Sequence, residues 1–399
     1  MMEEWKEVKL GELLKIKYGK DHKKLDEGNV PLMGTGGLMR YVNDYLYDEE
    51  SILIPRKGTL SSLFFMDKPF WTVDTMFWSK VNKKLVNPKY LYFYLKTINL
   101  ASYNVGSTIP SLTTNLLNNL KITIYQSKET QRKIASILSA YDDLIENNLK
   151  RIKLLEEQAQ LTYEEWFVRF KFPGHETVKF DEETGLPEGW EKVKLVECAN
   201  LIMGQSPKSE FYNNEEKGLP FHQGVKDYGF RFPTNSSWST QGNRIAKENS
   251  ILFSVRAPVG RLNVALEEII IGRGLAAINH KKGWNSLLLY QLQNIFYEDN
   301  LMGGGAIYNS VTKKDVQDIE IISATKDIHI KYNDFSSNVD KQIKNLTKQN
   351  LHLKEARDIL LPRLMSGMID VEKLDVGSLK YEVNDSLGMV AEETSDFKK

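Results

Sequence analysis

The stretch WKEVKLGELLKIKYG, residues Trp5–Gly19, returns later in the chain as WEKVKLVECANLIMG, residues Trp190–Gly204. The Trp, Val, Leu, Glu and Gly at matching positions of the two stretches are all 185 residues apart. This period is far longer than the repeat of a solenoid protein, which is about 20 to 50 residues. The sequence therefore predicts a duplicated domain and a molecule with two similar ends, for which a partner with two similar half-sites is natural.

Further matching segments extend the repeat toward the end of the chain. The pairs are Ser51–Leu53 with Ser250–Leu252, Gly106 and Ile109 with Gly304 and Ile307, and Asp142–Asn147 with Asp340–Asn345. The offset grows from 185 to about 198 residues, as insertions in loops would cause. The two copies agree in these framework positions and differ in the loops between them. One scaffold with two different loop surfaces is expected to recognise two different short sequences.

The composition is that of a soluble globular protein. The 399 residues suggest two or three domains, and 41% are hydrophobic and 27% charged. The single cysteine, Cys198, excludes a disulfide framework and favours a reducing compartment. We identify no signal peptide and no apolar run long enough to cross a membrane, so we expect a cytoplasmic protein.

The formal net charge is zero, so the distribution of charge matters more than its sum. The end of the chain, residues 370–399, holds eight acids and four bases, has few large apolar residues, and is expected to be a flexible acidic tail. Bases gather instead between residues 228 and 266, where Glu248 is the single acid.

Residues 1–130 are predicted to form a first α+β domain. Short β-rich runs alternate with Gly and Pro, and a helix is expected at Pro88–Ile98 because Leu91, Leu95 and Ile98 share a face. The expected strands are Ser51–Pro55, Leu63–Met66, Thr72–Val81 and Leu120–Tyr125.

Residues 131–174 are predicted to form a long helix. Its mostly apolar positions recur in alternating steps of four and three residues, which is the 3.5-residue period of a coiled coil. They are Ile134, Leu138, Tyr141, Ile145, Asn148, Ile152, Leu155, Ala159, Thr162 and Trp166. Pro173 and Gly174 are expected to end the helix.

After an acidic linker at 175–189, residues 190–326 are predicted to form the second domain and residues 327–369 a second long helix. Its seam consists of Tyr332, Val339, Ile343, Leu346, Leu353, Leu360 and Leu364, with polar residues at Ser336, Asn350 and Arg357. Pro362 is expected to kink the helix or to end it early.

The simplest way to bury both seams is to pack the two helices antiparallel against each other, with the globular domains at opposite ends. Each helix of about 40 residues would span roughly 60 Å. The alternatives are packing onto their own domains or onto another chain. Asn148 and Asn350 fall on the seams, where a buried Asn would fix the register of the pair, unless both are exposed at a splayed stretch.

The sequence offers no recognisable catalytic site. We find no phosphate loop, no His or Cys grouping at metal-ligand spacing, and no nucleophile elbow. Cys198 lies in an apolar, helix-like run and is interpreted as a core residue. We expect this chain alone to catalyse nothing and to bind no metal.

Nucleic acid could bind where strands deliver basic side chains to turns, as at Arg56 and Arg256, and where polar loops follow the first strand of each copy. Such residues can reach phosphates, and Arg can also pair with guanine. The candidates are Lys20, Lys23, Lys24, Thr35, Arg56, Lys57, Ser107 and Thr108 in the first copy, and Gln205, Ser206, Lys208, Gln223, Lys226, Arg231, Arg244, Arg256, Arg261 and Tyr308 in the second. Solvated surface turns of no function are the alternative.

Together these features resemble the specificity subunit of type I restriction–modification enzymes. The most specific segments are LLEEQAQ (Leu154–Gln160) leading to Trp166 and Phe167, GLPEGWEKVKL (Gly185–Leu195), and LLPRLMSG (Leu360–Gly367). The resemblance covers the chain to about residue 370. It implies two target recognition domains that each read half of a bipartite DNA site, separated by two spacer helices.

The resemblance also implies partners. Modification subunits, two of them in our interpretation, would dock on the helices and methylate adenine with S-adenosylmethionine, and restriction subunits would add ATP- and Mg²⁺-dependent cleavage. The residues expected to serve helix packing or docking are Tyr141, Ile145, Asn148, Ile152, Leu155, Trp166, Val339, Ile343, Leu346, Leu353 and Leu360. Arg357 and Pro362 stand where the first helix has Ala159 and Glu164, so the two docking faces need not be equivalent.

Two other functions remain open from the residues alone. One is an enzyme with a buried nuclease or methyltransferase site, against which the missing motifs argue. The other is a coiled-coil protein–protein adaptor with two binding heads that do not bind DNA, against which the basic, acid-poor strand–turn units argue.

Overall fold

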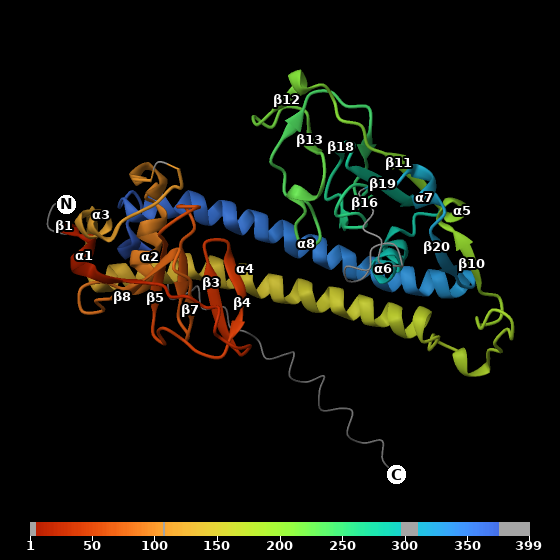
Figure 1. The fold of residues 1–399 in the computed structure, drawn as a ribbon, viewed down its shortest axis with the longest axis horizontal. Helices are drawn as coiled ribbons and strands as arrows, with labels where there is room; N and C mark the ends of the chain where they lie inside the picture. The colour runs from red at the N-terminus through yellow and green to blue at the C-terminus, as the bar shows by residue number, and fades with distance from the viewer. Residues whose placement is uncertain (1–4, 107, 297–309, 375–399) are drawn as a thin grey trace, which may run out of the picture. The chain divides into compact units, whose positions relative to one another are not determined.

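The chain folds into two compact units, and each unit combines a globular domain with part of both long helices. A computed structural model describes residues 5–106, 108–296 and 310–374 (Figure 1). Residues 1–146 group with 350–399, and residues 147–349 form the second unit. The boundary therefore falls within the two long helices, α4 (Lys128–Tyr163) and α8 (Lys326–Met365).

The globular domain of the first unit is built on three small sheets. Strand β1 (Trp5–Lys9) pairs antiparallel with β9 (Lys121–Tyr125). A four-stranded antiparallel sheet has the order β2 (Leu14–Tyr18), β8 (Met76–Val81), β5 (Ser51–Pro55), β6 (Phe64–Met66). A three-stranded sheet has the order β4 (Gly37–Val42), β3 (Val30–Gly34), β7 (Trp71–Thr72). Short helices α1 (Leu10–Leu13), α2 (Pro88–Lys96) and α3 (Thr114–Asn119) complete the domain.

Helix α2 shows why these residues adopt their local structure. Asn87 caps its first turn by accepting a hydrogen bond from the backbone N–H of Tyr90 at 2.9 Å, and Pro88 takes the first helical position. Tyr90, Leu91 and Leu95 are fully buried in the core that also holds β5. The predicted helix is present and ends two residues earlier than expected. Three predicted strands are present as β5, β6 and β9. The expected single strand Thr72–Val81 is wrong, because the chain turns at residues 73–75 and divides it between β7 and β8, which belong to different sheets.

The second unit repeats this plan. Strand β10 (Glu191–Lys194) pairs with β20 (Glu320–Ser323). A four-stranded sheet has the order β11 (Ala199–Met203), β19 (Leu275–His280), β16 (Ile251–Ser254), β17 (Leu262–Val264). A larger sheet has the order β12 (Tyr212–Asn213), β14 (Trp238–Ser239), β13 (Leu219–His222), β18 (Ile269–Ile271), β15 (Ile245–Ala246). The helices of the domain are α5 (Leu195–Cys198), α6 (Asn285–Ile295) and α7 (Lys313–Gln317).

The duplication predicted from sequence is confirmed by the strand pairing. The order β11-β19-β16-β17 repeats β2-β8-β5-β6, and the parallel pair β13 and β18 repeats β3 and β7. The repeated residues have the same tasks in both copies. Glu12 and Glu197 each accept the backbone N–H of the residue that precedes α1 or α5. At Gly19 and Gly204 a Cβ would lie 2.0 and 2.2 Å from a carbonyl oxygen of the neighbouring turn, so no side chain fits.

Within each unit, α4 and α8 pack against each other and run antiparallel (Figure 1). In the first unit Asn350 Nδ2 donates to the carbonyl of Ile145 at 3.5 Å, and Arg357 pairs with Asp142. In the second unit the Tyr332 hydroxyl donates to the carbonyl of Ala159 at 2.9 Å. The predicted intramolecular helix pair is therefore present, with Tyr332 fully buried.

The predicted seam faces inward along most of both helices. Ile145, Asn148, Ile152, Val339, Ile343 and Leu346 are buried, and Tyr141, Leu155, Trp166, Leu353 and Leu360 are half-buried. Asn148 and Asn350 are 7% and 5% exposed. The interpretation that both lie exposed at a splayed stretch is therefore wrong.

The seam changes face near the end of α4, which the sequence did not predict. Residues Glu164–Val168 form a π-helical turn, closed by the Arg169 N–H donating to Glu164 O at 2.8 Å. A π turn inserts an extra residue, so the positions beside it rotate around the axis. Phe167 within this turn and Tyr163 directly before it are buried, whereas the expected Thr162 and Trp166 are half-buried. Helical structure ends at Val168, ahead of Pro173, whereas α8 continues past Pro362 to Met365.

Residues 370–374 do not belong to a solvated tail, contrary to the expectation for 370–399. Val371 is 1% exposed in the core of the first unit, and Glu372 accepts hydrogen bonds from the Thr130 hydroxyl at 2.9 Å and the Lys133 ammonium at 2.6 Å. The apolar Val371 anchors this segment to α4. The rest of the expected tail lies outside the described residues.

Candidate nucleic-acid interface

In the first unit, loops from distant parts of the chain meet at one edge of the sheets. The Lys20 N–H donates to Thr72 O at 2.9 Å, and the Arg56 N–H donates to Thr75 O at 2.8 Å. The Gly58 N–H donates to Pro110 O at 2.9 Å, which brings the loop of Thr108 to the turn of Arg56 and Lys57. These backbone bonds gather four of the predicted candidates into one region: Lys20, Arg56, Lys57 and Thr108. Thr35 lies beside them, because a Cβ at Gly58 would lie 3.8 Å from its hydroxyl oxygen.

Arg56 is held in a defined orientation within this region. Its Nε donates to the carbonyl of Asp74 at 2.6 Å, and its guanidinium pairs with the Asp74 carboxylate at 3.2 Å. The guanidinium also lies over the Tyr18 ring, 5.7 Å from its centroid. An arginine fixed on both sides is suited to directional contacts with a ligand.

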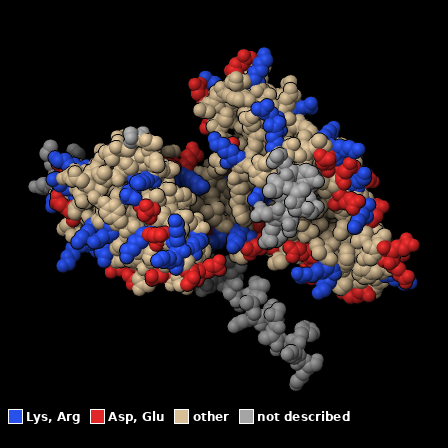
Figure 2. Space-filling model, viewed as in Figure 1, with Lys and Arg blue, Asp and Glu red and all other residues tan. Residues whose placement is uncertain are grey.

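Lys23 and Lys24 are exposed on a loop that is tied down at two points. Asp21 accepts the backbone N–H groups of His22 and Lys23, and the bond from Lys23 is the largest of the effects that lower the pKa of Asp21. Arg40 on β4 donates to the carbonyls of His22 and Leu25, both at 3.0 Å. Figure 2 shows Lys and Arg side chains over the part of the first unit to which β3, β4 and β7 belong.

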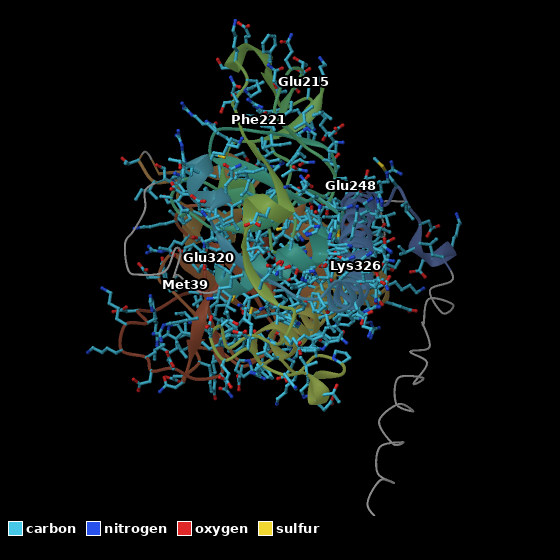
Figure 3. The ribbon with its side chains drawn as sticks, turned by 90° about the vertical axis from the view of Figure 1, so that its right-hand side faces the viewer. Met39, Glu215, Phe221, Glu248, Glu320 and Lys326 are labelled. Carbon is cyan, nitrogen blue, oxygen red and sulfur yellow. The ribbon has the colours of Figure 1, made fainter. Side chains whose placement is uncertain are left out.

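The hairpin of β3 and β4 presents apolar side chains that sequence reasoning missed. Leu38, Met39 and Tyr41 are 51%, 55% and 51% exposed, and Met39 is marked in Figure 3. The hairpin turns at Thr35 and Gly36, and Gly37 has a positive φ of 103°. Exposed apolar residues grouped on one hairpin are typical of an interaction surface. A two-stranded ribbon of this kind fits the major groove of DNA.

The equivalent loops of the second unit meet in the same way. The Gln205 N–H donates to Ile271 O at 3.0 Å, and the Val255 N–H donates to Gly274 O at 2.9 Å. Arg256 forms a backbone bridge with Ser310, as Lys57 does with Ser111 in the first unit. The loops enclose a pocket of about 200 Å³ lined by Gln223, Gly224, Val225, Ser254, Arg256, Ala257, Arg273 and Gly274.

The other predicted residues of the second unit fall into three groups. Gln205, Ser206, Gln223 and Arg256 lie on the loops that meet around this pocket, at residues 205–206, 223–225, 254–257 and 272–274, which we call the meeting loops. Ser206 Oγ accepts the Arg273 N–H at 3.4 Å. Lys208, Lys226 and Arg244 are exposed nearby on the same domain. Arg261 lies elsewhere, because it lines a groove beside α4 together with Glu156, Glu157 and Glu164. Ser107 and Tyr308 lie outside the described residues.

Arg231 is a correction to the candidate set. It is 5% exposed and pairs with Glu156 of α4 at 3.3 Å and with Asp340 of α8. The Tyr290 hydroxyl donates to the same Asp340 carboxylate at 3.1 Å. Burial opposes the charge of Arg231, but Asp340, Tyr290 and Glu156 together hold its pKa above the ordinary value. Arg231 therefore fastens the second globular domain to both helices and cannot reach a ligand at the surface.

Arg273 is the functional candidate that sequence reasoning missed. It is exposed at the rim of the pocket, at the tip of the turn between β18 and β19. The signal in the sequence was its position between Gly272 and Gly274, two glycines in a row of strand-forming residues. A Cβ at Gly274 would lie 2.4 Å from Gln223 O, so the glycines let this turn pack tightly.

In the part of the chain that the structure describes, no group of three or more His, Cys, Asp or Glu side chains could hold a metal ion. None of the helices in the described ranges is both long and apolar enough to span a membrane. Cys198 is half-buried against the core of the second unit rather than within it, and burial raises the pKa of its thiol to about 11.

Comparison with known proteins gives a consistent result. Residues 2–157 and 187–360 match the family described as type I restriction modification DNA specificity domain, once in each half of the chain. The chain is 32% identical over 300 residues to the putative type I restriction enzyme MjaX specificity subunit of Methanocaldococcus jannaschii, covering 73% of this chain and 70% of that protein. It is 29% identical to the MjaIX specificity subunit of the same organism, covering 82% and 80%.

A solved structure shares the fold. The S subunit of a type I restriction–modification system from M. genitalium aligns with a TM-score of 0.59 at 18% identity, covering 90% of this chain and 96% of that one.

Proposed function

The chain belongs to the family of type I restriction modification DNA specificity proteins, and we propose that it reads a bipartite DNA site on behalf of partner subunits. Each globular domain would bind one half-site through its meeting loops. Modification subunits docked on the chain would then methylate adenine in that site, and restriction subunits would cleave DNA that lacks the methyl groups. In this proposal the chain itself is not catalytic and acts in the cytoplasm.

The observation that carries the proposal is that the two copies bring the same loops together but place different side chains on them. The first copy has Arg56 paired with Asp74, and the second has Arg256 and Arg273 around a pocket. Base pairs differ in the donors and acceptors that they present in the major groove. Equal scaffolds with unlike loop residues are therefore suited to two unlike half-sites.

The neutral net charge of the chain favours binding of DNA together with partner subunits rather than by the chain on its own. Its net charge is zero, and candidate bases such as Lys208 pair with nearby acids. Proteins that bind DNA alone rely on many phosphate contacts, which make binding strong and dependent on salt. We infer that the modification subunits make much of the contact with DNA phosphates and that they bind S-adenosylmethionine. The restriction subunits would bind ATP and Mg²⁺.

The test is selection of DNA from a randomised pool by the purified complex of this chain with its modification subunits. We expect enrichment of a motif with two specified parts and a gap of fixed length. A soluble complex that enriches no sequence would contradict the proposal and favour a protein–protein adaptor. The chain incubated alone with DNA and Mg²⁺ or S-adenosylmethionine is expected to leave the DNA unchanged.

A further inference from the structure

The turn between β18 and β19 in the second unit occupies the same place as the turn between β7 and β8 in the first. The Val255 N–H donates to Gly274 O at 2.9 Å, as the Arg56 N–H donates to Thr75 O at 2.8 Å. The residues before these two acceptors are Arg273 and Asp74. The duplicated fold therefore places side chains of opposite charge at one equivalent position of its two copies.

The turn that carries Arg273 is held on both sides. The Gly272 N–H donates to His222 O at 2.8 Å, and the Gly274 N–H donates to Gln223 O at 3.0 Å. The Arg273 N–H itself donates to Ser206 Oγ at 3.4 Å. A Cβ at Gly272 would lie 2.9 Å from the Cα of Gln223, so the turn packs directly on the backbone of the neighbouring loop. The backbone of Arg273 is thus fixed while its side chain is exposed.

The surroundings of Arg273 leave its guanidinium available. The pocket beside it is lined by Arg256 and otherwise by uncharged residues, among them Gln223 and Ser254. Among the described residues, no carboxylate forms an ion pair with Arg273 or Arg256. In the first unit the Asp74 carboxylate pairs with Arg56 at 3.2 Å and is 68% exposed. One copy thus offers a donor fork at the turn tip, and the other offers an acceptor.

We propose that the tip of this turn is a base-reading position in each copy, with Arg273 pairing with a guanine in the half-site of the second domain. The inference rests on the proposed function and names a residue that carries its specificity. Arg binds the O6 and N7 atoms of guanine through two parallel hydrogen bonds, and Asp accepts from the amino group of cytosine. Asp74 fills the corresponding acceptor position for the first half-site.

A base contact fits the geometry better than a phosphate contact. Phosphate contacts depend mainly on charge, whereas a two-bond base contact requires a planar fork that projects from a well-defined backbone position. Three hydrogen bonds, donated by the backbone N–H groups of residues 272–274, hold the turn of Arg273 against the neighbouring loops. Gln223 lies on one of these loops, and its side-chain amide can also read base edges.

The test measures adenine methylation of a library of target sites by the full complex, with wild-type chain, Arg273→Lys, Arg273→Gln and Asp74→Asn. Lys217→Gln is the matched control, because Lys217 is exposed on the same domain but outside the meeting loops. Arg273→Lys keeps the charge and loses the planar fork, so it separates the two kinds of contact.

We expect both Arg273 variants to lose preference for guanine at one position of one half-site, by about 5- to 150-fold, which corresponds to the ~1–3 kcal/mol of a bidentate base contact. Asp74→Asn should alter a position in the other half only, and Lys217→Gln should leave the motif unchanged.

Three results would overturn the inference: an unchanged motif, a uniform loss over all sequences, or wild-type preference in Arg273→Lys. If a variant methylates nothing, DNA selection by the same complex decides. An inactive Arg273 variant should still select the half-site that the first domain binds. Loss of that half-site from the selected DNA would also count against the inference. A wild-type complex without any two-part motif would instead contradict the proposed function.

Discussion

At the scale of single residues, the fold depends on a cluster of charged side chains around the buried Arg231. Its guanidinium joins Glu156 and Asp340 at the junction of the second globular domain with both helices. Burial raises the pKa of Glu156, and Arg231 opposes that shift. Arg231 therefore stabilises the charged form of Glu156 at this half-buried junction.

Replacing Arg231 by Met should lower the free energy of unfolding of the full chain by about 3–5 kcal/mol, because two half-buried carboxylates would lose the buried cation between them. Urea denaturation followed by tryptophan fluorescence would measure the loss. Arg244→Met removes the same charge from an exposed position and should change the stability by less than about 0.5 kcal/mol. Equal losses in the two variants would show that the cluster does not hold the domain in place.

Two histidines of the second unit should make the chain sensitive to mild acid. His280 Nδ1 accepts the Lys282 N–H at 3.1 Å, and His329 Nε2 accepts the Ala324 N–H at 2.9 Å. Burial is the main cause that lowers the pKa of each to about 4, with nearby Lys282 adding to the effect. Since the unfolded state takes up protons below about pH 6.5, their contribution is complete above that pH and is lost as pH falls toward 4.

The urea midpoint of the chain should therefore be lower at pH 5 than at pH 7. His329→Gln keeps an acceptor near the Ala324 N–H and cannot be protonated, so it should reduce the difference between the two midpoints. If the wild-type midpoint were the same at both pH values, the buried histidines would not be neutral in the folded chain.

The sequence correctly pointed to arginines at the meeting loops, but it could not distinguish an exposed arginine from a buried one. Arg56 and Arg256 lie where a strand–turn pattern predicted them. Arg231 has a similar local sequence, yet it is buried by residues of α4 and α8 that are 75 and 109 positions away. Burial by distant elements leaves no local pattern. Arg273 was missed because its two flanking glycines are a weak signal and its place at the rim of the pocket depends on loops that are distant in sequence.

At the scale of elements, the helix seam was predictable as far as Ala159 because it follows from a simple period. The start of α4 also had a local signal, since Ser127 Oγ accepts the Thr130 N–H at 3.2 Å as a capping residue. The π turn at Glu164–Val168 had none. It is favoured by the packing of Phe167 against Trp190 and Tyr332, which lie far from it in sequence.

The buried asparagines of the seam should cost stability. An amide at a seam position favours one register at the expense of apolar packing. The double change Asn148→Leu with Asn350→Leu should therefore raise the urea midpoint, whereas Asn345→Leu, on an exposed position of α8, should leave it nearly unchanged. A lower midpoint in the double variant would mean that the hydrogen bonds of these amides outweigh their cost.

At the scale of the whole molecule, the helices that connect the two units should set the distance between half-sites. Inserting one heptad after Glu146 in α4 and another after Gln349 in α8 keeps the seam in phase and lengthens both helices by about 10 Å. At roughly 3.4 Å per base pair, the gap of the DNA motif should grow by about three base pairs. The two specified parts should stay the same.

A heptad inserted in α4 alone is the control, because it breaks the pairing of the helices and should abolish specific methylation. An unchanged gap in the doubly lengthened chain would contradict the assignment of the helices as spacers. DNA selection by the complex would measure both variants.

The plan of the molecule could be predicted from sequence because duplication and helical period are visible along the chain. The DNA target could not, because it depends on how loops such as those of Thr35, Gln223 and Arg273 meet in space and on the shape of the DNA. The 185-residue spacing of Trp5 and Trp190 reveals the duplicated plan of the molecule, but it contains no information about the DNA sequence that the loops would bind.

The central claim is that this chain directs methylation to a bipartite site. Its most direct test is to map adenine methylation in DNA from cells that co-express the chain with its modification subunit. The account predicts one motif with two unlike parts and a fixed gap, of which exchange of residues 1–130 alters only one part. New methylation that is absent despite a soluble complex, or a motif in which that exchange alters both parts, would contradict it.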